Sequence, residues 1–259
     1  MKQKMDSVSV VYYSPTDTTK KIATAIAEGT GVADVHAYNL TATGSLPATV
    51  AASDLLVLAA PVYSGRVSPT ALERFRDILP KGTPVIAAVV YGNRDYEDAL
   101  LELCDFASAH EMPVVAAGAF IGEHSYSKEN MPVAAGRPDE ADLGIARRLG
   151  EEAVRRLSEG LPAEALSVKG NRPYREVKPK PPVAPVCSDS CTGCGRCISV
   201  CPVDAISKTA DGQIVTDVNL CTLCCACVKK CTFGARLFDS PFTKVLYENF
   251  RARREPELF

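Results

Sequence analysis

The chain of 259 residues lacks tryptophan, contains three histidines and has one cysteine, Cys104, in its first 186 residues. The other ten cysteines lie between Cys187 and Cys231. A secreted, disulfide-linked protein would rarely leave its largest part almost without bridges. This distribution therefore argues against a disulfide framework and indicates metal ligands.

The sequence also lacks a long apolar run and a strong excess of charge of one sign. No run reaches the ~20 residues that span a bilayer, and the amino terminus enters a strand-like stretch without an apolar signal region. The formal net charge of −2 leaves no basic surplus to neutralise phosphates. We expect a cytoplasmic protein that binds neither membranes nor nucleic acids.

Residues 1–160 alternate strand-like and helical patterns. Continuous runs of Val, Leu, Ile and Ala are typical of central strands covered on both faces. Strands are predicted at Ser7–Tyr13, Asp34–Leu40, Asp54–Tyr63, Pro84–Tyr91 and Pro113–Ile121. Helices are predicted at Thr18–Glu28, Pro69–Leu79, Tyr96–His110 and Pro138–Glu159. This order indicates right-handed crossovers and a doubly wound, parallel α/β domain.

The composition changes after residue 160. Residues 161–186 form a Pro/Lys-rich linker without apolar periodicity, which either docks on a neighbouring domain or acts as a spacer. Residues 187–239 have too few large apolar side chains to fold without a metal or disulfides. Residues 240–259 have a helical apolar stripe, which predicts a C-terminal amphipathic helix that packs on a neighbouring domain.

Two runs of four cysteines share the spacing C-x2-C-x2-C-x3-C and form an internal repeat. In two-cluster ferredoxins, three cysteines of such a run surround one cubane, and the fourth ligates the other cluster. We therefore expect two [4Fe–4S] clusters. The first set of ligands would be Cys191, Cys194, Cys197 and Cys231. The second set would be Cys221, Cys224, Cys227 and Cys201.

Zinc is the alternative metal, because zinc sites also use C-x2-C pairs. A tetrahedral zinc site needs only two such pairs, usually ~15–20 residues apart, so four regular cysteines repeated once favour clusters. Cys187, Cys225 and Cys104 lie outside the runs. The first two are either spare ligands or small buried apolar residues, and Cys104 is expected in a helix core.

The loop after the first predicted strand, residues 14–19, reads SPTDTT. It places four hydroxyl groups at a helix amino terminus, where backbone amides and hydroxyls can bind a phosphate. Loops that bind a dinucleotide carry G-x-G-x-x-G, and this loop has no glycine. A single phosphate therefore favours FMN over NAD, and a capped helix start that binds nothing is the alternative.

Two further loops follow the third and fourth predicted strands, at residues 61–67 and 91–96. Ligands of doubly wound sheets bind outside the carboxyl ends of the strands, near the switch in strand order. Both loops contain a glycine that lets backbone approach a ring and aromatic residues that can stack on it. His124 and Tyr126, after the fifth strand, either approach the flavin or the first cluster, or lie on the surface.

These three loops resemble those of flavodoxin. Nearly the whole chain, including Gly118–Ser127 (GAFIGEHSYS) and the linker, is similar to the flavodoxin–ferredoxin fusion family. The resemblance implies a five-stranded flavodoxin-like sheet with order 2-1-3-4-5, followed by a small α+β ferredoxin-like domain. It implies that the phosphate of FMN contacts Ser14, Thr16, Thr18 and Thr19. It implies that the flavin ring contacts Pro61, Val62, Tyr63, Gly65, Tyr91, Gly92, Asn93 and Tyr96.

One position of the phosphate loop departs from flavodoxin in charge. Asp17 and Thr18 stand where flavodoxin loops carry Gly and Asn. Asp tolerates a left-handed backbone better than most residues. Its carboxylate either repels the phosphate or points to solvent, and Lys20 and Lys21 are near enough to offset its charge.

The expected function is electron transfer between two [4Fe–4S] clusters and a bound FMN, with redox proteins as partners. One alternative is an FMN-dependent reductase of a small substrate, which the clusters supply with electrons. Another is a carrier that uses only the clusters and whose α/β domain binds no flavin. Transfer between flavin and cluster can take place within one chain or across a homodimer.

Overall fold

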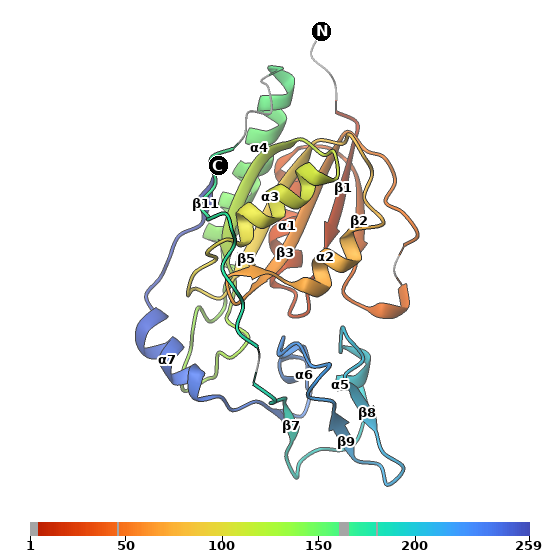
Figure 1. The fold of residues 1–259 in the computed structure, drawn as a ribbon, viewed down its shortest axis with the longest axis vertical. Helices are drawn as coiled ribbons and strands as arrows, with labels where there is room; N and C mark the ends of the chain where they lie inside the picture. The colour runs from red at the N-terminus through yellow and green to blue at the C-terminus, as the bar shows by residue number, and fades with distance from the viewer. Residues whose placement is uncertain (1–4, 46, 161–165, 180) are drawn as a thin grey trace.

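The computed structural model describes residues 5–45, 47–160, 166–179 and 181–259. A large α/β domain contains most of the secondary structure, and a small cysteine-rich domain lies below it (Figure 1). None of the helices in these ranges is long and apolar enough to span a membrane.

Five parallel strands form the sheet of the large domain. They are β1 (Ser7–Tyr12), β2 (Asp34–Asn39), β3 (Leu55–Tyr63), β5 (Val85–Tyr91) and β6 (Val114–Ile121). Their order is β2-β1-β3-β5-β6, with the two-residue β4 (Arg66–Val67) antiparallel to β3. This order confirms the predicted doubly wound, flavodoxin-like topology. The apolar runs in β3, β5 and β6 are buried because helices cover both faces of the sheet.

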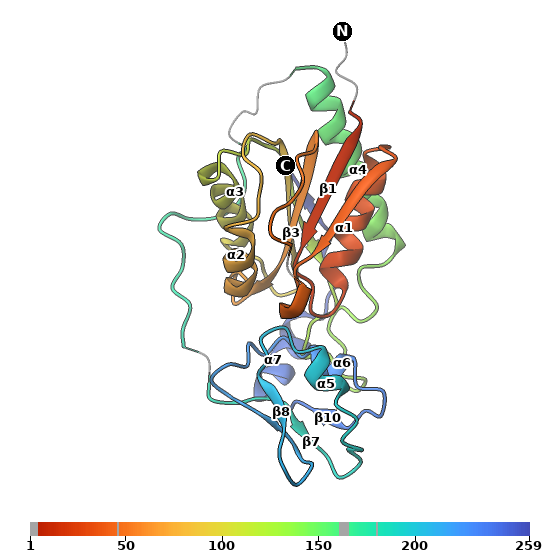
Figure 2. The same cartoon turned by 90° about the vertical axis from the view of Figure 1, so that its right-hand side faces the viewer.

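Two helices cover each face of this sheet (Figure 2). α1 (Thr18–Gly29) and α4 (Glu140–Ser158) pack on one face. α2 (Pro69–Phe75) and α3 (Ala99–Ala109) pack on the other, and η1 (Thr43–Ser45) is a short 3-10 turn after β2.

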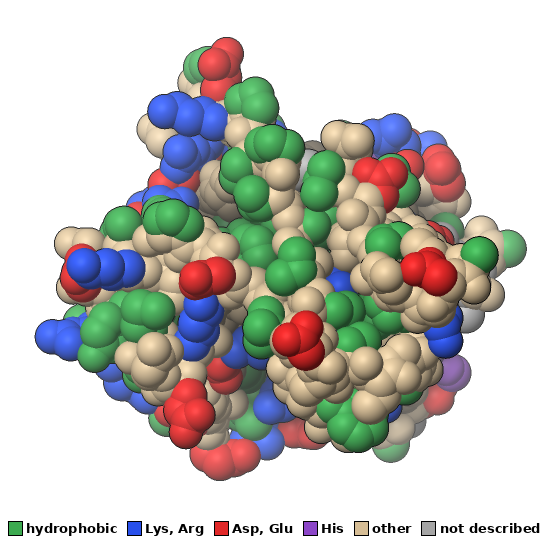
Figure 3. Space-filling view, turned by 90° about the horizontal axis from the view of Figure 1, so that it is seen from below, with side chains coloured by type: hydrophobic (Ala, Val, Ile, Leu, Met, Phe, Trp, Pro, Cys, Tyr) green, Lys and Arg blue, Asp and Glu red, His purple; other side chains and the backbone are tan. Residues whose placement is uncertain are grey.

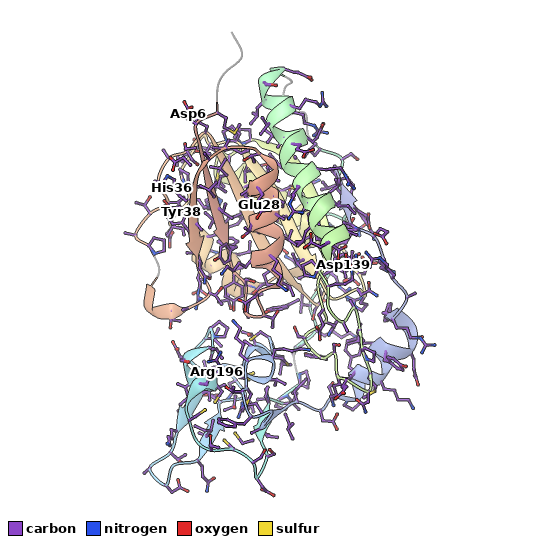
Figure 4. The ribbon with its side chains drawn as sticks, turned by 180° about the vertical axis from the view of Figure 1, so that it is seen from behind. Asp6, Glu28, His36, Tyr38, Asp139 and Arg196 are labelled. Carbon is purple, nitrogen blue, oxygen red and sulfur yellow. The ribbon has the colours of Figure 1, made fainter. Side chains whose placement is uncertain are left out.

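The helices α1 and α4 lie in close contact. A Cβ atom at Gly150 would overlap the carbonyl oxygen of Ile26, so only glycine allows this approach. Nearby, the Nε of Arg147 donates to Glu28 at 3.0 Å. Glu28 is labelled on α1 in Figure 4. The last turn of α1 is therefore packed tightly against α4.

The small domain is an internal repeat built on very little apolar core. Its elements are β7 (Val186–Cys187), α5 (Arg196–Ser199), β8 (Ile206–Lys208), β9 (Ile214–Thr216), α6 (Ala226–Lys229) and β10 (Arg236–Leu237). β10 pairs with β7, and β8 pairs with β9. Small side chains such as Ala226 and Cys225 are buried, and the apolar cluster of the domain consists of Cys197, Ile206, Ile214 and Cys227. Two of these four residues are predicted cluster ligands, so the sulfur atoms are part of the core itself.

The lower face of the small domain carries exposed apolar side chains (Figure 3). Val186 and Leu237 face each other across the β7–β10 pair, and their exposed fractions are 62% and 48%. Val215 of β9 is also exposed.

The predicted linker docks on the large domain. Within residues 166–179, the Nε of Arg172 donates to Asp105 at 2.9 Å. The carboxylate of Asp98 accepts hydrogen bonds from the backbone N–H groups of Asn171 and Arg175. Residues 161–165 and 180 of the predicted linker lie outside the described residues.

The tail differs from the helix predicted for residues 240–259. Its helix, α7, covers only Pro241–Phe250, and β11 (Glu257–Leu258) pairs antiparallel with β6. The helix does not continue to residue 259 because Pro256 cannot be accommodated in a helix interior, and because the outer edge of β6 offers backbone groups that pair with Glu257 and Leu258.

Candidate functional site

Five cysteines line one hollow in the small domain. The hollow has a volume of about 10 Å³, and apolar side chains such as Val203 and Ile206 form part of its wall. Of the five cysteines in its wall, one is Cys225 and the other four are Cys201, Cys221, Cys224 and Cys227. These four are the residues that the sequence assigns to the second cluster, three from one run and one from the other.

The backbone of each run turns through left-handed conformations. In the second run, Leu223 and Cys225 have φ values of 58° and 56°. In the first run, Gly193 and Gly195 have φ values of 66° and 78° at the positions 30 residues earlier. The two loops therefore share one conformation, in which a segment of only seven residues bends around a common centre.

The sulfur atoms of the second set lie in a mixed environment of amides and apolar groups. The backbone N–H of Ala205 donates to the Sγ of Cys201 at 3.3 Å. Burial raises the pKa of Cys224 to about 12, and a hydrogen bond from the backbone N–H of Ala226 lowers this pKa only in part. A thiolate at Cys224 therefore needs a cationic centre beside it, which an iron–sulfur core provides.

The first set of cysteines lies nearer the surface. Cys197 is buried in the small core and Cys191 packs against it, whereas Cys194 is exposed. Burial raises the pKa of Cys231, but three backbone N–H groups outweigh it, and the pKa is lowered. These donors belong to Arg236, Phe233 and Ala235. Across the described ranges, no three His, Cys, Asp or Glu side chains converge closely enough to hold a single metal ion.

The second set lies against the carboxyl ends of β1 and β3. Tyr13 follows β1 and is fully buried; burial raises its pKa, and the charge of Cys224 raises it further. Burial and Cys224 raise the pKa of Tyr63, the last residue of β3, in the same way. The switch in strand order lies between β1 and β3, so the small domain covers the edge where doubly wound sheets bind ligands.

The predicted phosphate loop lies at the amino end of α1. The backbone N–H of Lys20 donates to the Oγ of Ser14 at 2.9 Å, which closes the loop. Thr16 and Thr18 are partly exposed, and Thr18 packs against Gly122 at the end of β6. The hydroxyl of Thr19 is buried without a hydrogen-bond partner in the described part of the sequence. A buried hydroxyl at a helix start fits an anionic group such as a phosphate.

Asp17 is paired with the small domain. Its backbone is left-handed, with a φ of 65°, so it takes the conformation that glycine usually provides. Its carboxylate lies 3.0 Å from the Nζ of Lys230, directly before the predicted ligand Cys231. The cation that pairs with Asp17 is therefore Lys230, in place of the expected Lys20 and Lys21.

The residues predicted to contact the flavin ring fall into two groups. Pro61, Val62, Tyr63 and Gly65 lie at the end of β3, next to the second set of cysteines. Tyr91 and Gly92 lie at the end of β5, where the imidazole of His124 fills the space beside Gly92.

Asn93 and Tyr96 belong to the second group and are held by the tail. The Nδ2 of Asn93 donates to the carbonyl oxygen of Ala252 at 2.8 Å. The hydroxyl of Tyr96 donates to Glu257 at 2.7 Å. A cavity of about 440 Å³ between Asn93, Gly136 and Tyr247 separates this loop from α7.

Aromatic side chains connect the flavin loop to the cysteine loop. The rings of His124 and Tyr126 meet edge to face at 5.0 Å. Tyr126 lies 4.9 Å from Phe238 of the small domain, and burial, followed by the charge of Cys225, raises its pKa. His124 and Tyr126 are therefore partly buried, and Tyr126 lies beside cysteines of the second run, not beside the first set as one alternative had it.

His124 makes the large domain sensitive to acid. Burial, followed by Arg94 and Lys229, lowers its pKa from 6.5 to about 4. Between these two pH values the unfolded protein binds a proton that the folded protein does not, so stability falls as the pH drops from about 6.5 toward 4. From pH 7 to 5 we expect the wild type to lose about 1–2 kcal/mol more than His124→Gln. Urea unfolding followed by far-UV circular dichroism at both pH values measures this difference, and parallel curves would refute it.

The contacts between the domains were not predictable from the motifs. The Nζ of Lys229 lies 2.5 Å from Glu123 and 3.0 Å from the carbonyl oxygen of Ser127. Arg74 of α2 donates to the carbonyl oxygen of Pro202, which follows Cys201. The one sequence signal was the basic pair Lys229–Lys230 directly before Cys231, which has no role in holding iron.

Comparison with protein families identifies a 4Fe-4S binding domain at residues 188–207. One subunit of a tetrathionate reductase from Archaeoglobus fulgidus is 40% identical over 53 residues, 20% of this chain and 25% of that protein. One component of a polysulfide reductase from Wolinella succinogenes is 40% identical over 57 residues, 21% of this chain and 29% of that protein. The match thus spans only about a quarter of the length of these relatives.

Among solved structures, a flavodoxin from the domain Archaea aligns with 58% of this chain and 98% of its own, at 18% identity and a TM-score of 0.41. An oxidoreductase from Corynebacterium diphtheriae aligns with 62% of this chain and 99% of its own, at 21% identity and a TM-score of 0.41. The strand order and the cysteine-rich domain together describe a flavodoxin-like α/β unit joined to an iron–sulfur unit.

Proposed function

We propose that this protein, a flavodoxin-like domain joined to a 4Fe–4S ferredoxin domain, relays electrons between two [4Fe–4S] clusters and an FMN bound at the edge of its sheet. One observation carries the proposal. The hollow formed by Cys201, Cys221, Cys224 and Cys227 lies against Tyr13 and Tyr63, at the switch in strand order. An electron-transfer domain is thereby placed over the ligand-binding edge of the other domain.

The cysteine residues fit two clusters. The second set lines one hollow together with apolar side chains such as Val203 and Ile206, which shield the sulfur atoms from water. The first set combines the exposed Cys194 with Cys231, whose thiolate the backbone amides favour. An electron from a redox partner protein would then enter through the first set, and the second set would face the large domain.

The phosphate loop fits FMN. Ser14, Thr16, Thr18 and Thr19 would hold the phosphate, and Lys230 draws the charge of Asp17 away from it. FMN bound there would supply a centre that exchanges one or two electrons, whereas each cluster exchanges one. His124 and Tyr126 exclude water between the two sites, and His124 stays uncharged at neutral pH because its pKa is about 4.

Replacing the hydroxyl group of Thr19 by a methyl group tests whether the phosphate loop binds FMN. Thr19→Val removes the unpartnered hydroxyl and keeps the shape of the side chain, so the fold should be as stable as the wild type. A hydrogen bond to a charged group contributes about 1.5–3 kcal/mol, so the Kd for FMN should rise about tenfold or more. Quenching of FMN fluorescence by flavin-free protein measures this Kd.

The matched control is Thr30→Val, because Thr30 is a buried threonine at the other end of α1. It should leave the Kd for FMN unchanged. Equal affinities for Thr19→Val and the wild type would show that Thr19 does not hold the phosphate.

Reductive titration under anaerobic conditions tests the relay itself. Two clusters and one FMN should together accept about four electrons per polypeptide. Uptake of about two electrons, with no flavin absorption, would indicate the carrier that uses only the clusters.

Reduction of a small substrate is a second candidate function. The observation that favours it is the cavity of about 440 Å³ beside Asn93, which Arg251 and Arg253 also line. If this cavity opens on the flavin, acetate or inorganic phosphate should shift the flavin absorption spectrum. An unchanged spectrum would favour the relay.

A further inference from the structure

Arg236 is a cation buried at the centre of the small domain. Only 2% of its surface is exposed. Its Nη2 donates to the carbonyl oxygen of Pro185 at 2.8 Å and to the hydroxyl of Thr216 at 2.7 Å. Its Nε is buried without a hydrogen-bond partner in the described ranges. The guanidinium is thus held in place through Nη2, whereas the N–H group at Nε has no acceptor.

No carboxylate pairs with this guanidinium in the part of the sequence that the structure describes. The other deeply buried arginine, Arg137, has the fully buried carboxylate of Asp142 as its partner. A buried charge without a counter-ion is strongly unfavourable, so the fold must supply a negative group near Arg236.

The groups that face Arg236 are sulfur atoms. Its Nη1 lies 3.3 Å from the Sγ of Cys187, and its Nη2 lies 3.9 Å from the Sγ of Cys227 in the second set. Its backbone N–H donates to the Sγ of Cys231 in the first set. One residue therefore contacts a ligand of each set, and its charge lies between the two sets.

This position matters for reduction, because four thiolates around an iron–sulfur core make an anionic centre. Each reduction adds one negative charge to that centre, and a buried cation stabilises the reduced state more than the oxidised state. Charge and hydrogen bonds at the sulfur atoms are among the main determinants of cluster potentials.

We propose that Arg236 is the buried counter-cation of the cluster pair and raises the reduction potential of the cluster held by Cys201, Cys221, Cys224 and Cys227. This inference rests on the proposed function, since it requires that clusters bind. Arg236 is a positioning and tuning residue in this scheme. It ligates no iron. Reduction of the cluster forms and breaks no bond to Arg236, which acts through its charge alone.

The test compares reduction potentials of full-length variants, measured by electron paramagnetic resonance during redox titration at one pH. Arg236→Met should shift the reduction equilibrium of one cluster at least about tenfold toward the oxidised state, which is about 59 mV for one electron. Arg236→Lys keeps the charge and should shift it by less than half as much. Lys208→Met removes one charge from an exposed side chain of the same domain and should shift it least.

A potential for Arg236→Met equal to that of the wild type or of Lys208→Met would overturn the proposal. If Arg236→Met holds no iron, Arg236→Gln replaces it as the neutral variant. If both neutral variants lose their iron and Arg236→Lys keeps all of it, the clusters require a positive charge at position 236, and the proposal is supported. Loss in all three would assign Arg236 to folding and reject the proposal. A wild type without iron would instead reject the proposed function.

Discussion

Replacing Cys201 and Cys221 together by alanine is expected to remove about four of about eight irons per polypeptide, no more than either replacement alone. The two residues belong to different runs, yet both line the same hollow. If both residues ligate the same cluster, the loss of one ligand already releases that cluster, and the loss of the other ligand releases no further iron. The measurement is the iron content of each variant after anaerobic purification.

The matched pair is Cys201→Ala with Cys194→Ala, two cysteines of the same run. These residues belong to different sets, so this double variant should lose both clusters and retain almost no iron. If each run held its own cluster, the outcomes would be exchanged. The same-run pair would then keep about four irons, and the Cys201–Cys221 pair would keep almost none.

Loss of a cluster should also loosen the small domain. Its apolar cluster consists of Cys197, Cys227, Ile206 and Ile214, and its other buried side chains are mostly Ala and Cys, so apolar burial alone is too small to hold the fold. Metal binding supplies part of the folding free energy in such domains. The single variants should therefore expose the small domain to proteolysis, whereas the α/β domain stays resistant.

The second large effect concerns the stability of the α/β domain. The Nε of Arg137 donates to the carboxylate of Asp142 at 2.7 Å, and both side chains are buried at the start of α4. Asp142→Ala would leave the guanidinium buried and unpaired, and would remove the acceptor for the N–H of Asp139. We expect the free energy of unfolding to fall by about 3–5 kcal/mol.

The control for this variant is Glu152→Ala, on the exposed side of α4. Glu152 pairs with Arg155 at 2.7 Å in solvent, where such pairs contribute less than about 1 kcal/mol. Urea unfolding followed by circular dichroism compares the two. Similar losses for both variants would mean that the Arg137–Asp142 pair is no more important than a surface pair.

The sheet and the cysteine sets followed from local patterns in the sequence. The strand runs are continuous and apolar because both faces are covered, and such runs are visible without the fold. The spacing of the cysteines predicts two ligand sets, which remain a prediction; Cys201, Cys221, Cys224 and Cys227 of the second set line one hollow together with Cys225.

Contacts between distant segments were beyond the reach of these patterns. Lys230 meets Asp17 across more than 200 residues of sequence, and the tail reaches Asn93 from residue 252. A basic residue beside a cysteine, such as Lys230, and a polar residue after a strand, such as Asn93, belong to no periodic pattern from which a partner could be predicted. Arg236 was hidden for the same reason, since only its burial distinguishes it from a surface arginine.

The most direct test is the iron, sulfide and zinc content of the full-length protein purified without oxygen. Two clusters on the paired cysteine sets require about eight irons and about eight sulfides per polypeptide, with no zinc. Zinc in place of iron, or iron without sulfide, would contradict the assignment of the cysteines and with it the electron-transfer function.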